Sequence, residues 1–216
     1  MSKKRKKKKG QPLKPPRRVY QMPRSKIRPL RTRREEILER AREMPIVGCW
    51  RHKQWQKIGE TTLLLARAQN DHTVLYAGYL VDLLCLGVKD ALVKLNVPRP
   101  ALQRHVERIF RGDQEPCDAA FAHQLVYGAI AFARKYGFEP HEDFYRLGAH
   151  KILDPPGSHP EPYDIKFGKD GKPVYIAGPY DSPSFVNKVL DTLERTAPGK
   201  YHFVAPLSDE DLFEDL

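Results

Sequence analysis

One apolar run, from Val74 to Val93, constrains the fold of this chain more than any other stretch of the sequence. A run this apolar has to be buried. Gly78, Asp82 and Gly87 interrupt it too often for a membrane-spanning helix. A carboxylate inside a buried run is costly unless it is hydrogen-bonded, paired or bound to a metal. Asp82 is therefore the first residue that a structure has to explain.

Positive charge is concentrated at the N-terminus. The 216 residues include 38 Lys and Arg against 27 Asp and Glu, and residues 1–34 hold 16 of the basic residues and no acidic one. The remaining residues therefore have 22 basic and 27 acidic groups, a net charge of −5. We predict that residues 1–30 form a disordered basic arm, because high charge and repeated proline leave little to fold around.

A basic arm of this kind is typical of proteins that bind polyanions. Nucleic acid, with RNA preferred, is the favoured partner, and the alternative is a solubilising arm without a specific target. A membrane is the least favoured partner, because no apolar face accompanies the lysine run. The residues expected to contact nucleic acid in the arm are Lys3, Lys4, Arg5, Lys6, Lys7, Lys8, Lys9, Arg17 and Arg18.

A second candidate for nucleic-acid contact is the segment from Cys49 to Trp55, which interleaves two Trp with basic residues. Trp50 and Trp55 could stack on bases while Arg51 holds a phosphate. The alternative is structural, with one Trp in the core and the other covering a hydrophobic edge.

The cysteines and the N-terminus indicate a cytoplasmic protein. Cys49, Cys85 and Cys117 are few, odd in number and far apart, which favours reduced thiols. The charged N-terminus is not followed by an apolar segment, so it does not match a signal peptide. No apolar stretch reaches transmembrane length.

The patterning predicts an α+β fold: a mixed-sheet lobe with helices over residues 31–153, followed by smaller elements. The predicted strands are Ile46–His52, Thr61–Ala68 and a third that begins at Val74. The second and third should pair as a hairpin, central or covered by helices because both faces are apolar. Residues 83–95 could be helical. The predicted helices are Arg31–Glu43, Pro100–Arg111, Pro116–Tyr136 and Pro140–Leu153.

The C-terminal part is predicted to be a ββαβ unit over residues 163–207 that docks on the first lobe, after a proline-rich connector at 154–162. Its expected strands are Tyr163–Phe167, Val174–Ala177 and Tyr201–Ala205, with a hairpin turn at Lys169–Gly171. Its expected helix runs to Thr196, capped by Asp181 or Ser182. Residues 208–216 form an acidic tail.

Three blocks of sequence carry a resemblance: Leu80–Asp90, Tyr136–Asp143, and Phe167–Pro173 with Gly178-Pro179. In this order they resemble a family of uncharacterised bacterial proteins over roughly residues 45–205. The resemblance implies a bacterial, cytosolic origin and one co-inherited unit. That family has no established function, so the resemblance implies no catalytic residue. The lysine-rich start lies outside it.

Asp82 and Asp90 are the candidate catalytic residues. Two carboxylates at the end of a buried strand resemble the arrangement that holds Mg²⁺ in nucleases, and Asp118, Glu139 and Asp143 could complete such a site. The weak metal-ligand candidates are Asp82, Asp90 and Asp143. The favoured alternative is structural: Asp82 would hold backbone at a bend, and Asp90 would cap a following helix.

A zinc site formed by Cys117, His123, His141 and Asp143 is disfavoured, because their spacing is irregular. In the structural alternative Cys117 is a small core residue and His141 caps a helix. Cys85 is a poor nucleophile in its apolar run. The chain has no P-loop, and ordinary capping explains Gly178–Ser182 better than phosphate binding does.

The sequence therefore favours a nucleic-acid-associated binding protein without a cofactor. The first alternative is a metal-dependent nuclease or phosphohydrolase that uses Asp82 and Asp90 with Mg²⁺. The second is a protein-interaction module in which the acidic tail contacts a basic partner or the arm. Convergence of Asp82, Asp90, Asp118 and Asp143 in one cleft would favour the enzyme.

Overall fold

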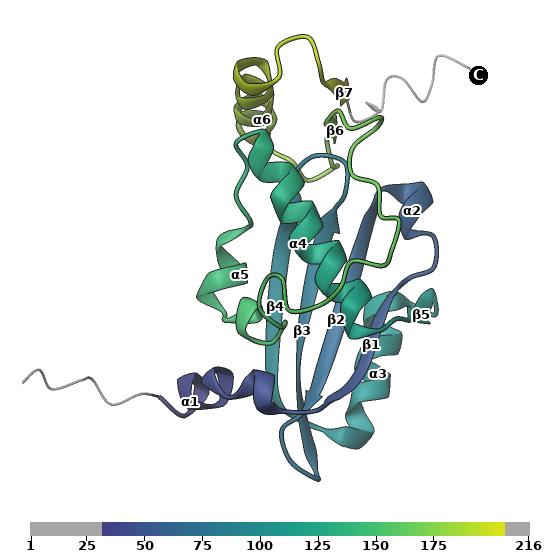
Figure 1. Ribbon diagram of the computed structural model, residues 1–216, viewed down its shortest axis with the longest axis vertical. Helices are drawn as coiled ribbons and strands as arrows, with labels where there is room; N and C mark the ends of the chain where they lie inside the picture. The colour runs from purple at the N-terminus through teal and green to yellow at the C-terminus, as the bar shows by residue number, and fades with distance from the viewer. Residues whose placement is uncertain (1–31, 206–216) are drawn as a thin grey trace, which may run out of the picture. The chain divides into compact units, whose positions relative to one another are not determined.

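A five-stranded antiparallel sheet is the centre of the fold (Figure 1). The computed structural model describes residues 32–205, which belong to one compact unit. The sheet order is β4-β3-β2-β1-β5. The strands are β1 (Ile46–His52), β2 (Glu60–Ala68), β3 (Thr73–Asp82), β4 (Gly87–Pro98) and β5 (Gln114–Pro116). The basic arm and the acidic tail expected from the sequence lie outside the described residues.

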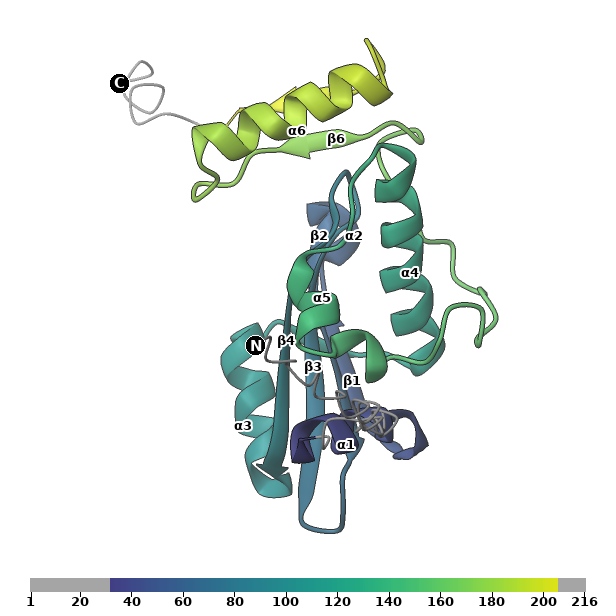
Figure 2. The ribbon, with the colours of Figure 1, turned by 90° about the vertical axis from the view of Figure 1, so that its left-hand side faces the viewer.

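Helices cover both faces of this sheet (Figure 2). The helices are α1 (Arg33–Glu39), η1 (Ala41–Glu43), α2 (Trp55–Ile58), α3 (Arg99–Phe110), α4 (Ala119–Lys135), α5 (Glu142–Arg146), η2 (Ala149–Lys151) and α6 (Pro183–Thr196). Alternate residues of β2 serve the two faces: Leu63 and Leu65 pack in the core under α4 and α5, while Leu64 and Ala66 pack under α3. The α+β class and the doubly covered central strands are as the sequence predicts.

The long helix α4 forms where the sequence predicts it. The Asp118 side chain caps its first turn by accepting the Phe121 N–H at 2.8 Å. The chain leaves the helix through Gly137, whose φ of 84° is accessible to glycine at little cost. Ten side chains of the helix are buried, and most of them face the sheet core.

The expectation of a helix within residues 83–95 is wrong, because this stretch turns and then forms β4. Residues 83–86 make a tight turn, and β3 and β4 pair on either side of it. Beyond the turn burial alternates, with Ala91 and Val93 buried and Leu92 and Lys94 exposed. That period of two belongs to a strand. Asp90 therefore lies inside a strand and does not cap a helix.

The helix expected over Pro140–Leu153 is two short pieces, α5 and η2. Gly148 separates them with φ 80°, a left-handed conformation that ends a helix. A Cβ at this position would lie 2.8 Å from Leu38 Cδ1, so a larger residue would also require the Leu38 side chain to shift. The break at Gly148 allows α5 to lie along the edge strand β4. The sequence alone predicted one longer helix here.

The C-terminal unit is βαβ, since the expected first strand, Tyr163–Phe167, is not formed. Two strands, β6 (Val174–Ile176) and β7 (His202–Val204), pair in parallel and are joined by α6. Residues before β6 run beside α4, where Gln124 accepts the Tyr163 N–H at 3.0 Å. The Tyr163 N–H is therefore satisfied by a side chain of α4 and not by a neighbouring strand. The turn at Lys169–Gly171 survives as a bridge between Lys169 and Lys172.

The C-terminal unit docks on the turn between β3 and β4. Cys85 and Leu86 of this turn share a hydrophobic cluster with Tyr175, Val189 and Leu193. The Val174 N–H also donates to the Leu84 carbonyl at 3.0 Å. Ser182 caps α6 by accepting the Phe185 N–H at 3.2 Å, one of the two caps predicted. The junction between the two parts of the molecule is therefore this four-residue turn together with the end of α4, where the Tyr136 carbonyl accepts the Thr196 hydroxyl at 3.0 Å.

Candidate functional site

Asp82 holds the backbone of the turn that follows β3. Its carboxylate accepts the N–H groups of Leu84, Cys85 and Leu86 at 2.7, 3.2 and 2.9 Å. Burial raises the pKa of Asp82, although these N–H donors and the charge of Lys89 act in the opposite direction. The structural alternative for Asp82 is confirmed, since both of its oxygens serve the turn.

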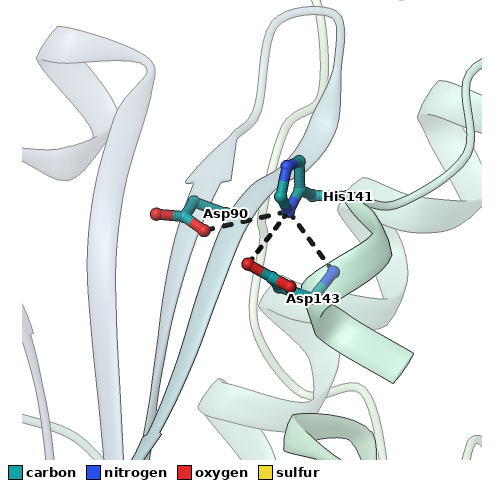
Figure 3. Close-up of side chains that lie close together, drawn as sticks. All are labelled: Asp90, His141 and Asp143. Carbon is teal, nitrogen blue, oxygen red and sulfur yellow. Dashed lines mark hydrogen bonds and ion pairs between the residues drawn. The ribbon is translucent and has the colours of Figure 1, made fainter. Parts of the chain in front are cut away.

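Asp90, His141 and Asp143 form an acid–histidine cluster at the edge of the sheet (Figure 3). Asp90 projects from β4, and the other two residues open α5. The His141 N–H donates to the Val88 carbonyl at 2.8 Å, which fastens the start of α5 to the edge strand. One ligand atom from each of the three side chains lies within 4.8 Å of the other two. Docking of α5 on β4 thus joins two residues that are far apart in sequence.

Nδ1 of His141 is the centre of this cluster. It lies 3.8 Å from Asp90 Oδ1 and 3.8 Å from Asp143 Oδ2. It also accepts the Asp143 N–H at 3.3 Å, so His141 caps the helix as predicted. Asp143 makes a further ion pair with Arg146. Nδ1 of His141 and the two carboxylates therefore converge on one position between the three side chains. A divalent cation could take the same position if the ligands moved closer, since neighbouring ligands of a 2.0–2.2 Å shell lie roughly 3 Å apart.

A cavity of about 420 Å³ lies beside the acid–histidine cluster, and His141 forms part of its wall. Its other charged lining residues are Lys89, Glu139, Asp181 and Lys188. Burial lowers the pKa of Lys89, but the hydrogen bond and charge of Glu60, 2.7 Å away, outweigh it and raise that pKa. The cavity therefore keeps a charged ammonium next to an apolar wall supplied by β4 and α6.

The remaining carboxylates proposed for a metal site do not belong to the acid–histidine cluster, although Glu139 lines the cavity beside it. Asp118 caps α4, and Glu139 forms an ion pair with Arg134 at 2.7 Å. Asp82 belongs to the turn. Convergence of Asp82, Asp90, Asp118 and Asp143 would have favoured an enzyme, and of these four carboxylates only Asp90 and Asp143 lie close together. Among the described residues, His141 is the third potential ligand beside Asp90 and Asp143. The sequence analysis considered it as a metal ligand only in the disfavoured zinc set.

The zinc set itself is dispersed. His123 is buried in α4, and its Nε2 pairs with the Pro155 carbonyl at 2.7 Å. Cys117 lies beside Cys49 between β1 and β5, with 3.2 Å between the sulfur atoms. Neither residue belongs to the acid–histidine cluster. His123 therefore contributes to the packing of the connector on α4.

The aromatic segment Trp50–Trp55 is taken up by packing, the alternative left open by the sequence. Trp55 is only 5% exposed and meets Phe121 edge to face, with the ring centroids 5.2 Å apart. Arg51 pairs with Glu115 at 2.9 Å and lies over the Phe121 ring. Trp50 is half-buried against the α3 core. In this conformation Trp55 offers no free face on which a base could stack.

The sequence analysis did not predict a cationic surface that is centred on α3. We define it as Arg104 and Arg108 of α3 together with Lys94 at the adjoining end of β4, the three cations whose charges act on His105. None of the three cations has a carboxylate within 4.0 Å in the part of the chain that the structure describes. Desolvation lowers the pKa of His105, and the three positive charges lower it further. The spacing of Arg104 and Arg108, four residues apart on one helix, was the available signal.

The fold and these sites define an α+β protein in which one sheet carries an acid–histidine cluster at its edge and a cationic helix on one face. Comparisons with protein-family models, curated proteins and solved structures found no match. Within residues 32–205 no helix has both the length and the apolarity needed to cross a membrane.

Proposed function

We propose that this chain is a cytoplasmic nucleic-acid-associated binding protein with RNA as its preferred partner. The observation that carries the proposal is the charge of residues 1–34, with 16 Lys and Arg and no Asp or Glu. Flexible lysines make point contacts with phosphate and read few base edges, so the arm supplies affinity with little sequence preference.

The cationic surface on α3 supports this proposal from the folded part of the chain. Its three cations lack acidic partners within residues 32–205, so a polyanion would not have to displace a carboxylate. Helix α3 covers the face of the sheet opposite α4 and α5 (Figure 2). Arg104 and Arg108 therefore lie on the other side of the sheet from α5, and together with Lys94 they would give the body of the protein its own contact with phosphate.

The test is a titration of labelled RNA and DNA of mixed sequence with the full chain and with a chain that starts at Arg31. Six to ten phosphate contacts should give a log–log salt slope of roughly −4 to −7 for single strands, at about −0.7 per contact. The shortened chain should bind far more weakly and melt at nearly the same temperature, because the arm has little apolar area to bury. Equal affinity of both chains, or binding that ignores salt, would refute the arm as the anchor.

The contribution of α3 is tested by Arg104→Gln with Arg108→Gln. If both side chains bind phosphate, the slope should become shallower by about 1.4, at about 0.7 for each arginine that no longer neutralises a phosphate. The matched control is Arg195→Gln with Lys200→Gln, which removes the same charge from exposed positions of the C-terminal unit. An equal effect of the two double variants would reduce the α3 contribution to net charge alone.

A metal-dependent nuclease or phosphohydrolase is the second candidate, because Asp90, His141 and Asp143 come together. Two carboxylates and an imidazole are ligands that suit divalent first-row metals and, with water, Mg²⁺. The test measures RNA cleavage with Mg²⁺ or Mn²⁺. This candidate expects cleavage that chelation abolishes and that Asp90→Asn removes, while the exposed control Asp191→Asn retains it. Intact RNA under all metal conditions would contradict the nuclease, and absence of phosphate release from a phosphomonoester under the same conditions would contradict the phosphohydrolase.

A further inference from the structure

The thiols of Cys49 and Cys117 face each other across two paired strands. β1 and β5 are antiparallel, with Arg51 opposite Glu115 and Trp50 opposite Pro116. Cys117 directly follows β5, and its N–H continues the ladder by donating to the Cys49 carbonyl at 3.0 Å. The two Sγ atoms lie 3.2 Å apart. The pairing of the strands, and not the sequence spacing, brings these two residues together.

This geometry suits a disulfide bond. Hydrogen-bonded pairs in antiparallel strands have Cα atoms about 5.5 Å apart, and disulfides span about 4.4–6.8 Å between Cα atoms. A disulfide needs an S–S distance of about 2.05 Å, so the sulfur atoms have to approach by roughly 1 Å. Side-chain rotation of this size leaves the strand pairing in place.

The two thiols differ in their access to solvent. Cys49 is 4% exposed, whereas Cys117 is partly exposed and lines a cavity of about 400 Å³ together with Arg51, Asp118 and Tyr163. The pKa of Cys49 is raised well above the ordinary thiol value, first by its hydrogen bond with Cys117 and then by burial. An oxidant that enters the cavity therefore reaches Cys117 first. Cys49 lies behind Cys117 and remains protonated.

We propose that Cys49 and Cys117 are a modification site at which a hydroperoxide forms a reversible intramolecular disulfide. The Cys117 thiolate attacks one oxygen of hydrogen peroxide, which breaks the O–O bond and gives a sulfenic acid and, with the thiol proton, water. The Cys49 sulfur then attacks the Cys117 sulfur, and the hydroxyl group leaves as a second water with the Cys49 proton. Both thiols are oxidised, the peroxide is reduced, and a dithiol reductant reverses the reaction. This proposal does not depend on the proposed function.

Cys85 supplies an internal control. It is fully buried in the cluster at the β3–β4 turn, and burial followed by the charge of Asp82 raises its pKa. It has no thiol neighbour among the described residues. A thiol in such surroundings reacts slowly with peroxide. Oxidation directed by geometry should therefore leave Cys85 reduced.

The experiment treats the full chain with hydrogen peroxide, unfolds it, alkylates the free thiols and measures mass and peptides. The expected product has lost two hydrogen atoms, carries one alkyl group on Cys85 and yields a peptide pair joined through Cys49 and Cys117. Treatment with dithiothreitol should restore three alkylated cysteines. The cross-link should also raise the melting temperature, roughly by 5–15 °C for a loop of this length.

Variants make the proposal falsifiable. Cys85→Ala should still form the cross-link. Cys49→Ala should instead leave Cys117 as a sulfenic acid that dimedone traps, because the second thiol is missing. Cys117→Ser should leave Cys49 alkylated after peroxide treatment. Three alkylated cysteines in the oxidised wild type, a disulfide that includes Cys85, or dimers joined between chains as the only product would overturn the proposal.

Discussion

The five-stranded sheet and the C-terminal βαβ unit are stabilised in different ways. The strands β2, β3 and β4 have 9, 10 and 12 residues, and the central pair β2 and β3 buries side chains on both faces. The strands β6 and β7 have three residues each, and every residue of β7 is exposed. The small unit buries its helix α6 against Cys85 and Leu86 of the β3–β4 turn and against Tyr136 and Phe138 at the end of α4. The sheet thus has its own core, whereas the small unit depends on the turn at the end of β3.

The largest effect is expected in the sheet, at Arg67. Its guanidinium is buried, pairs with Asp154 at 2.6 Å and donates to the carbonyls of Ile152 and Met44 at 2.8 Å each. Arg67→Ala should lower the free energy of unfolding by about 3–5 kcal/mol, because it leaves Asp154 Oδ1 and these carbonyls without their donor and removes the cation that balances the carboxylate. Urea unfolding measures this change.

The control for this variant is Arg40→Ala, at a side chain that is 76% exposed in its ion pair with Glu43. It should cost less than about 1 kcal/mol. If both arginine variants unfold at the same urea concentration, the buried ion pair does not support the sheet.

A smaller and local loss is expected in the βαβ unit from Leu193→Ala. Leu193 is fully buried on α6, and its truncation leaves a cavity that costs about 2–5 kcal/mol. We expect hydrogen exchange to speed up in β6, α6 and β7 while the amides of β2 and β3 stay protected, because the sheet has its own core. Equal loss of protection in both regions would show one cooperative unit and would break the comparison.

Asp82→Leu tests the turn that joins the two regions. The substitution leaves three N–H groups without their acceptor and should cost about 1–3 kcal/mol in urea unfolding. The βαβ unit should again lose protection first, because the turn supplies part of its core. A variant with unchanged stability that no longer responds to Mg²⁺ would instead mark Asp82 as a metal ligand.

The smallest expected effect is a pH dependence at Asp154. Burial raises the pKa of Asp154, but the hydrogen bond from His159 and the charge of Arg67 outweigh it, so the net shift is downward. A lowered pKa stabilises the fold above the unfolded value of about 3.8–3.9, and this stabilisation disappears as the pH falls through the folded value. The difference in stability between wild type and Asp154→Asn should therefore be widest at neutral pH and narrow below about pH 4. A constant difference would contradict this assignment.

Local pattern was enough to predict much of the sheet. β1 has the predicted bounds Ile46–His52, and β2 and β3 differ by one residue at their starts from the predicted positions, because their apolar content and the Asn70-Asp71 turn are local signals. The sequence analysis missed β4 because the residues on both sides of the turn are apolar. Such a run fits the period of a helix as well as the period of a strand. β5 has the sequence Gln-Glu-Pro, which carries no strand signal and forms only by pairing with β1.

The clusters depend on contacts that the sequence does not encode locally. The buried role of Asp82 was predictable, since its donors lie two to four residues away. The meeting of Asp90 with His141 requires α5 to dock on β4, and that of Cys49 with Cys117 requires β5 to return to β1. Each joins residues more than 50 positions apart. Periodicity gives the faces of single elements but not which edges meet.

The docking of α5 has a consequence for self-association. β4 is an outer strand of 12 residues, and an open outer strand is a template on which a second chain can add its own strand. The His141 N–H occupies the Val88 carbonyl, Asp90 and Lys94 place charges along the strand, and the pairing with β3 shifts register twice. Substitutions that free α5 from β4 would expose this edge, so aggregation of an otherwise folded chain would be their first visible defect.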